Sequence, residues 1–166
     1  MQTKEYIEAV RKITRLILTS PQKMIRENDM QNLCLEYNFD DIIRDVYTNL
    51  KNLGFEFIKS KFLDQNYYVL TVEGKDDTLS PVQYGILALV LSISKELDEN
   101  LKVSDLKEIF KEVWNSDFKF LIEKDYLREQ EDLGIIKITP LGKAILKELL
   151  PDLTLGNLLD ILKNEE

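Results

Sequence analysis

The sequence predicts a mainly α-helical chain that carries two small β-hairpins. Apolar residues recur at helical spacing along most of its 166 residues, and the period changes to two at 55–72 and again at 126–139. Each alternating segment follows three predicted helices. Because three helices followed by a β-hairpin is the element order of a winged-helix domain, we predict an α+β fold of two winged-helix domains in tandem.

The first half contains three predicted helices. One covers 3–19, and Ser20-Pro21 ends it because the residue before a proline is disfavoured in a helix. A short helix is predicted over 27–36. The third covers 40–53, with Asp40 or Asp41 as its cap and Gly54 as its left-handed stop. The residues expected to face the core on these helices are Ile7, Val10, Ile13, Ile17, Met30, Leu33, Cys34, Ile42, Ile43, Val46, Leu50 and Leu53.

A hairpin closes the first half, and the same order then repeats. Strands are predicted over 55–59 and 67–72. Ser80-Pro81 then starts a helix over 81–96, with a capping serine and a proline at the first helical position. Further helices begin at Val103 and Asp117, and a second hairpin follows over 126–139.

Two more amphipathic helices are predicted at the C-terminal end. Thr139-Pro140 begins a helix that runs through Leu149, and leucines at helical spacing over 155–162 indicate the last one. We therefore expect a first winged-helix domain over 1–74 and a second over 75–139. The helices of 140–166 are expected to pack on the second domain.

The composition excludes several classes of active site. With no histidine, the chain cannot build a Ser-His-Asp or Cys-His nucleophilic site or a histidine-ligated metal site. Its one cysteine, Cys34, cannot form an intramolecular disulfide or a multi-cysteine zinc site. The carboxylate pair Glu108/Glu112 is best explained as an exposed acidic face, and no glycine-rich phosphate loop is present. We predict a protein that is not an enzyme and that uses no cofactor and no metal.

The sequence also bears on localisation. It contains no run of eighteen apolar residues and does not open with a signal peptide. We expect a soluble, intracellular protein without a membrane partner. It would be nuclear in a eukaryote and cytoplasmic or nucleoid-associated in a prokaryote.

The net charge of −8 is unevenly distributed along the chain. Residues 1–26 carry +4 and residues 27–166 carry −12, so any contact with DNA would be local and auxiliary. The helices that precede the two hairpins, 40–53 and 117–124, carry too many carboxylates for direct sequence readout. The basic residues that could contact phosphates are Lys4, Arg11, Lys12, Arg15, Lys23 and Arg26. The alternative interpretation of the same residues, and the one we favour, is an ordinary solvated surface.

Helix 81–96 is apolar nearly all round, so it needs cover on more than one side. Its second face, which carries Leu87 and Leu91, could hold a partner helix in a groove. The same face could instead pack one predicted domain against the other. Trp114, at the end of a helix, could anchor a partner or close the core of the second domain.

A succession of segments along nearly the whole chain resembles the MAGE-homology family, which belongs to the kleisin-interacting tandem winged-helix proteins. The segments that match in order are Asp41–Phe57, where a helix ends in a Gly-Phe step before a strand, Tyr67–Leu70, Leu79–Pro81, Gly85–Leu91, Phe118–Leu127 and Thr139–Ala144. The resemblance implies a non-enzymatic subunit of an SMC complex of the five/six type, with roles in chromosome maintenance and DNA repair.

The same resemblance implies partners. Members of the family bind a kleisin subunit, pair with a RING-type ubiquitin-ligase subunit and help to hold DNA. The family's paired-leucine partner site falls on Ile17 and Leu18 of the first helix, with Leu16 beside them. Since Ile17 also lies on the core stripe, we expect only one of the pair to be exposed.

Two alternatives remain open at this point. A winged-helix transcription regulator would have the same domains and would bind DNA directly. A tandem winged-helix subunit of the ESCRT-II type would have the same fold without any DNA role.

Overall fold

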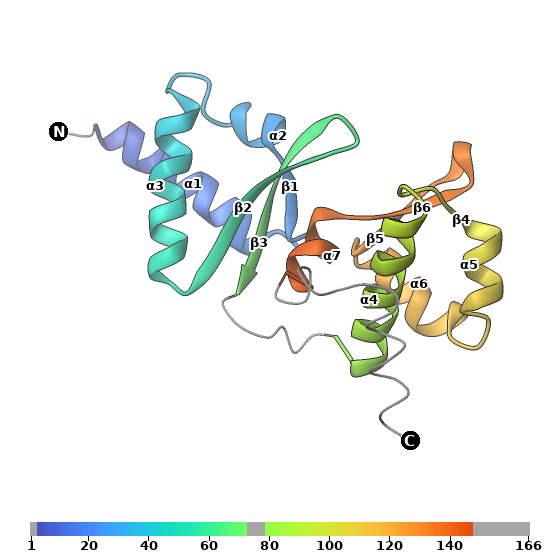
Figure 1. Cartoon of the computed structure of the whole chain (residues 1–166). Helices are drawn as coiled ribbons and strands as arrows, with labels where there is room; N and C mark the ends of the chain where they lie inside the picture. Colours follow the sequence, from blue (N-terminus) through green and yellow to red (C-terminus); the bar gives the residue numbers. More distant parts are fainter. Residues whose placement is uncertain (1–2, 73–78, 148–166) are drawn as a thin grey trace. The chain divides into compact units, whose positions relative to one another are not determined.

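The computed structural model describes residues 3–72 and 79–147 (Figure 1). The chain divides into two compact units, Met1–Lys75 and Asp76–Glu166. The expected domain boundary between 74 and 75 falls within 73–78, and the helix predicted over 155–162 falls within 148–166. Both lie outside the described residues, so these expectations remain predictions.

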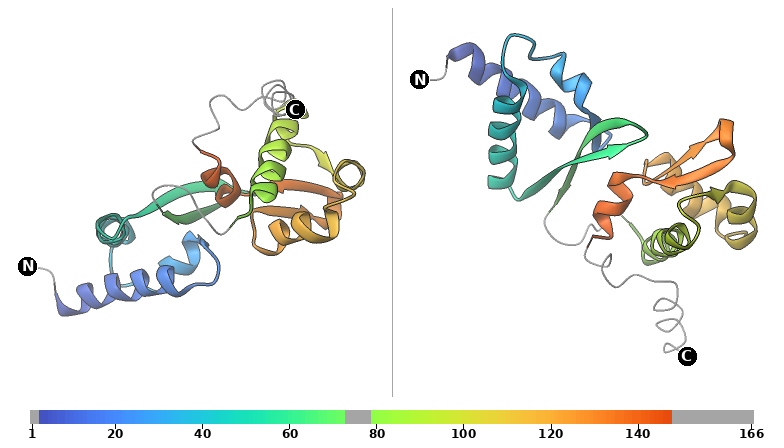
Figure 2. Two further views of the ribbon diagram at one scale, coloured as in Figure 1. Left: turned by 90° about the horizontal axis from the view of Figure 1, so that it is seen from below. Right: turned by 45° about the horizontal axis from the view of Figure 1, so that its top comes forward.

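The first unit has the element order helix, strand, helix, helix, strand, strand. Its elements are α1 (Lys4–Thr19), β1 (Met24–Arg26), α2 (Glu27–Gln31), α3 (Phe39–Asn52), β2 (Phe55–Phe62) and β3 (Gln65–Val72). The three strands form an antiparallel sheet in the order β1-β3-β2, and α1 packs against α3 (Figures 1 and 2). This is the arrangement of a winged helix, with β2 and β3 as the wing.

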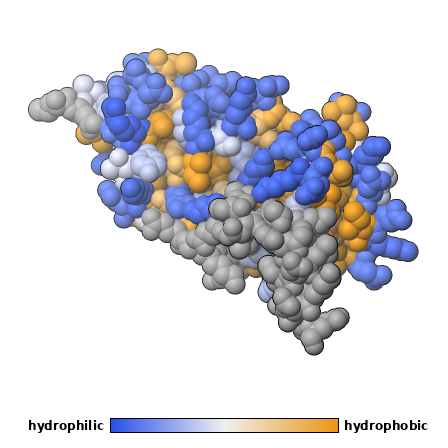
Figure 3. All heavy atoms as spheres, in the orientation of Figure 1, coloured by the Kyte–Doolittle hydropathy of each residue, from blue (hydrophilic) through white to orange (hydrophobic). Residues whose placement is uncertain are grey.

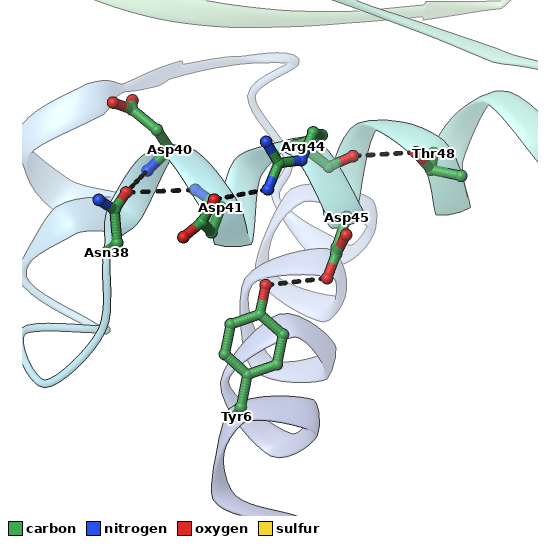
Figure 4. Close-up of polar contacts among 7 residues, drawn as sticks. All are labelled: Tyr6, Asn38, Asp40, Asp41, Arg44, Asp45 and Thr48. Carbon is green, nitrogen blue, oxygen red and sulfur yellow. Dashed lines mark hydrogen bonds and ion pairs between the residues drawn. The ribbon is translucent and has the colours of Figure 1, made fainter. Parts of the chain in front are cut away.

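Local sequence sets the ends of these elements. The Thr3 hydroxyl caps α1, and the Asn38 side chain accepts hydrogen bonds from the backbone of Asp40 and Asp41 to cap α3 (Figure 4). The cap of α3 is therefore Asn38 rather than either aspartate. Gly54 ends the helix with φ of +83°, a conformation that side chains with a Cβ rarely adopt.

The core of the first unit lies between the three helices and the inner face of the sheet. Most of the predicted inward residues are buried there, and Ile13, Ile17, Met30, Ile42, Val46 and Leu50 are fully enclosed. Three residues expected to face inward do not. Ile7, on α1, is 39% exposed. Leu33 is 37% exposed and Leu53 is 63% exposed, and both lie beyond the last residues of their helices, because α2 ends at Gln31 rather than near residue 36 and α3 ends at Asn52.

A buried carboxylate fixes the wing of the first unit to its body. Glu27, at the start of α2, accepts hydrogen bonds from Lys59 Nζ at 2.6 Å and Asn66 Nδ2 at 2.7 Å, and the Tyr68 hydroxyl lies 3.4 Å away. Although burial opposes ionisation, these hydrogen bonds and the positive charge hold the pKa of Glu27 below its usual value. The carboxylate thus joins α2 to both wing strands.

The second unit repeats the same order. Its elements are α4 (Pro81–Glu96), β4 (Leu101–Lys102), α5 (Val103–Ile109), a π-helical turn η1 (Trp114–Phe118), α6 (Lys119–Glu123), β5 (Leu127–Gln130), a short 3₁₀ turn η2 (Glu131–Leu133), β6 (Ile135–Ile138) and α7 (Pro140–Ile145). The strands pair antiparallel in the order β4-β6-β5. Ser80 caps α4 and Pro81 occupies its first turn, as the sequence predicts, and Gln83 completes a capping box with Ser80.

A close backbone approach holds α7 against the second wing. The Thr139 hydroxyl caps α7 and donates to the Asp125 carbonyl at 2.6 Å. A Cβ at Gly142 would overlap the carbonyl oxygen of Tyr126 and lie 3.0 Å from the Ile138 side chain. Only glycine therefore allows α7 to pack so closely on the start of β5.

The prediction of a mainly α, α+β fold with tandem winged helices is confirmed. Each unit also has a short first strand, β1 or β4, that the sequence pattern does not reveal. None of the helices in the described ranges combines the length and the apolarity that crossing a bilayer requires. Within the same ranges, no three Asp, Glu or Cys side chains gather as a metal site would require.

Candidate partner-binding groove

A groove runs along the first unit where α1 and α3 lie side by side. Its wider part, about 600 Å³, is lined by Arg11, Thr14, Arg15, Leu18, Thr19, Asn49, Asn52 and Leu53. A narrower part of about 280 Å³ is lined by Ile7, Val10, Arg11, Asp45, Thr48 and Asn49. The two parts share Arg11 and Asn49 and therefore adjoin each other, and we call them together the α1–α3 groove.

Helical periodicity explains which side chains reach the groove. Ile7, Arg11, Thr14 and Leu18 are spaced by three or four residues and therefore lie in one line along α1. Asp45, Asn49 and Asn52 form the corresponding line on α3. The groove thus combines apolar side chains with a basic border on α1 and a mostly neutral, polar border on α3.

A polar contact near one end of the groove links the two helices. The Tyr6 hydroxyl donates to Asp45 Oδ2 at 2.8 Å, and Figure 4 shows the ring rising from α1 to meet the carboxylate on α3. Burial, together with the hydrogen bond and negative charge of Asp45, raises the pKa of Tyr6 to about 12. Among the described residues that line the groove, the one carboxylate, that of Asp45, is therefore already engaged with the phenol.

In the part of the chain that the structure describes, neither Arg11 nor Arg15 is paired with a buried carboxylate. The Arg11 guanidinium lies 3.9 Å from Glu8, and both side chains are well exposed, so solvent screens the pair. Within the described residues, no ion pair joins the Arg15 side chain. Both positive charges remain available to a ligand that enters the groove.

The three residues predicted as a partner site on the first helix differ in accessibility. Ile17 is 0% exposed and belongs to the core, as its place on the core stripe implied. Leu16 and Leu18 are half-buried and pack on the edge of the core, and Leu18 also lines the groove. Of the three, Leu18 is the residue that lines the α1–α3 groove.

The face predicted for partner docking on helix 81–96 is not open. Leu87 is 0% exposed and Leu91 is 4% exposed. Within its own unit, α4 packs against β6 and against the π-helical turn η1. The burial of Leu87 and Leu91 shows that this second face is covered as well as the first, and we correct the expectation of an open groove there.

Trp114 is also internal. Its ring stacks on Phe118 with centroids 4.4 Å apart, and Lys107 Nζ lies 5.5 Å from the ring on the side of α5. The side chain is 9% exposed. Of the two interpretations of this tryptophan, closure of the second unit's core is the one that the packing supports.

The six predicted DNA-contacting residues, Lys4, Arg11, Lys12, Arg15, Lys23 and Arg26, are all exposed. Four lie on α1 and two lie around β1, and the structure brings only Arg11 and Arg15 into a shared groove. On the face seen in Figure 3, hydrophilic side chains cover much of the first unit, with apolar ones visible between them. Exposure is compatible with phosphate contact, so DNA binding by these residues stays a prediction.

The charge of the chain divides between the units. Residues 1–75 carry eleven basic and eleven acidic side chains, and residues 76–166 carry the whole net charge of −8. A polyanion would therefore be repelled by the second unit and tolerated by the first.

Comparison with known proteins finds a likeness in structure. The sequence matches no family model and no curated protein. A chain from the solved Nse1-Nse3-Nse4 complex superposes with a TM-score of 0.58 over 84% of this chain and 71% of that one, at 14% sequence identity. The two chains share a fold. This shared fold agrees with the tandem winged-helix fold that the sequence predicts.

Proposed function

We propose that the protein is a non-enzymatic scaffold subunit of an SMC-type complex that maintains or repairs chromosomes. The observation that carries the proposal is the fold shared with a chain of the Nse1-Nse3-Nse4 complex over 84% of the present chain. The MAGE-homology resemblance of the sequence supports it independently of the structure. An intracellular place, in a nucleus or nucleoid, follows from this role.

In this proposal the partners are a kleisin and a RING-type subunit. The RING-type subunit would contact the first unit through Leu18 and the α1–α3 groove. The kleisin would contact the second unit, where Leu87 and Leu91 are buried and other apolar side chains face solvent. These exposed side chains are Val82, Leu97, Ile109 and Leu133.

DNA contact is proposed only as an addition to these protein contacts. Arg44 on α3 is paired with Asp41, and the helix also carries Asp40 and Asp45, so α3 is not basic enough to enter a major groove unaided. The exposed basic residues of α1 and β1 would instead add affinity that falls with salt.

Co-purification tests the proposal. A tagged full-length chain expressed at native level should recover a kleisin and an SMC ATPase, both identified by mass spectrometry. Recovery of neither, with the chain folded, would overturn the proposal. Duplex binding across a salt series then separates a scaffold from a transcription regulator: tight, sequence-selective binding in physiological salt would favour the regulator.

A further inference from the structure

The chemistry of the α1–α3 groove is asymmetric. Leu53 is 63% exposed and Leu18 is half-buried, so apolar surface lies open within the wider part. Two guanidinium groups, those of Arg11 and Arg15, stand on the α1 border. On the α3 border, the neutral amides of Asn49 and Asn52 face the same space. A ligand must therefore satisfy an apolar surface, two positive charges on one side and hydrogen-bonding amides on the other.

The spacing of the arginines indicates the form of that ligand. Arg11 and Arg15 are four residues apart on a helix, which separates their Cβ atoms by roughly 6 Å. Carboxylates four residues apart on a second helix have the same separation, so two such helices can pair their charges directly. A volume of about 600 Å³ beside them accommodates one or two large apolar side chains.

We propose that the α1–α3 groove binds an amphipathic acidic helix, which places leucine-like side chains between Leu18 and Leu53 and two carboxylates, four residues apart, against Arg11 and Arg15. The inference rests on the proposed function in one respect: it assigns this helix to the RING-type partner. Apolar burial supplies most of the affinity, because exposed ion pairs are weak. The charges set the orientation of the helix and exclude basic competitors.

The same arginines could contact DNA, but the groove favours a peptide. Phosphates need positive charge and hydrogen-bond donors, and they gain nothing from an exposed leucine between the helices. A substitution of Leu53 therefore distinguishes peptide binding from DNA binding. The substitution affects a docked peptide and leaves a phosphate contact unchanged.

Two synthetic helical peptides provide the probe. Both carry leucines on one face, and they differ only in having two glutamates or two lysines at positions i and i+4 beside that face. Fluorescence anisotropy with the full-length chain at low salt measures the dissociation constant of each. The glutamate peptide is expected to bind about tenfold more tightly than the lysine peptide.

Three variants of the protein test the assignment. The double change Arg11→Glu with Arg15→Glu should invert the preference between the peptides. Leu53→Gln, at an exposed position, should weaken both peptides about tenfold. The matched control Lys4→Glu with Lys12→Glu reverses the same amount of charge on exposed residues of α1 outside the groove and should leave the preference in place. Equal binding of the two peptides, or no effect of Leu53→Gln, would overturn the inference.

A 20-base-pair duplex serves as the competing ligand. If it binds, and if Arg11→Glu with Arg15→Glu abolishes that binding while Leu53→Gln does not affect it, the surface is a phosphate contact and the inference is wrong. Co-purification distinguishes this failure from failure of the proposed function. The double arginine variant should lose the RING-type partner and keep the kleisin. If the double arginine variant keeps both partners, the assignment of the groove is wrong and the proposed function is unaffected. If neither the wild type nor any variant recovers a kleisin, the proposed function is wrong, whatever the peptides show.

Discussion

The hydroxyl of Tyr6 on α1 donates a 2.8 Å hydrogen bond to the carboxylate of Asp45 on α3. The contact joins the two helices that form the groove, at the end opposite Leu18 and Leu53. The groove therefore has a more polar end, near Asp45, and a more apolar end, near Leu18 and Leu53. Its shape depends on this link as well as on the core beneath it.

Removing the phenol hydroxyl should weaken this link. We expect Tyr6→Phe to lower the free energy of unfolding of the first unit by about 1 kcal/mol, because the Asp45 carboxylate loses a partly buried donor. Urea denaturation followed by circular dichroism measures the change. An unchanged midpoint would show that Asp45 is equally well solvated without Tyr6.

The same pair predicts a pH dependence. The pKa of Tyr6 is raised from 10.0 to about 12 in the folded protein, so the unfolded chain loses this proton first as pH rises. The stabilisation is complete below pH 10 and disappears between about pH 10 and pH 12. Because other groups also titrate there, the measurement is the difference in stability between the wild type and Tyr6→Phe. That difference should shrink across this window, and a constant difference would contradict the assignment.

The carboxylate of Glu27 should stabilise the first wing. We expect Glu27→Gln to lower the free energy of unfolding by about 1–3 kcal/mol, because it removes the charge that Lys59 and Asn66 both contact. Since the pKa of Glu27 is lowered in the folded state, this contribution is present above the ordinary value of 4.5 and is lost as the pH falls below it. The control Glu36→Gln changes an exposed carboxylate and should have little effect. Equal effects of the two changes would refute the role of Glu27.

Two glycines offer a matched pair in the second unit. Gly142→Ala should destabilise this unit, because the new Cβ overlaps the Tyr126 carbonyl. Gly85→Ala, in α4 with open space around its Cα, should stabilise the helix by about 0.5–1 kcal/mol. Trp114 is the single tryptophan of the chain and lies in the second unit, so the red shift of its emission reports unfolding there. If Gly142→Ala were as stable as the wild type, the close approach of α7 to the start of β5 would be contradicted.

The buried face of α4 gives a further prediction. Leu87→Glu should unfold the second unit, because a carboxylate would replace a side chain with no exposure. Val82→Glu, at an exposed position of the same helix, is the control and should leave the unit folded. If Leu87→Glu instead folded cooperatively and lost only partner binding, the face would be a docking site after all.

Much of the fold is readable from periodicity, and the failures have local causes. The helices α1, α3 and α4 carry repeated apolar positions with capping residues, so their limits are predictable to within a residue or two. The strands β1 and β4 are three and two residues long, which is too short to show a period of two. They exist because β3 and β6 offer free edges for them to pair with, and that information is not local.

The candidate site was less predictable than the fold. The basic line on α1 and the position of Leu18 could be seen in the sequence, whereas the groove depends on how α3 lies beside α1. Ile7 and Leu53 have the spacing of core residues, yet they border an open depression. The π-helical turn is equally unpredictable: the Phe118 amide bonds the Val113 carbonyl, which brings Trp114 and Phe118 into a stack.

The most direct test of the scaffold proposal is reconstitution with purified components. The full-length chain is mixed with the kleisin and the RING-type subunit of the same organism, and the mixture is analysed by size-exclusion chromatography with light scattering. The proposal predicts one peak with the mass of a 1:1:1 assembly, formed through separate surfaces so that either partner also binds alone. If the chain elutes by itself while the other two proteins are folded and pure, it is not the scaffold that joins them.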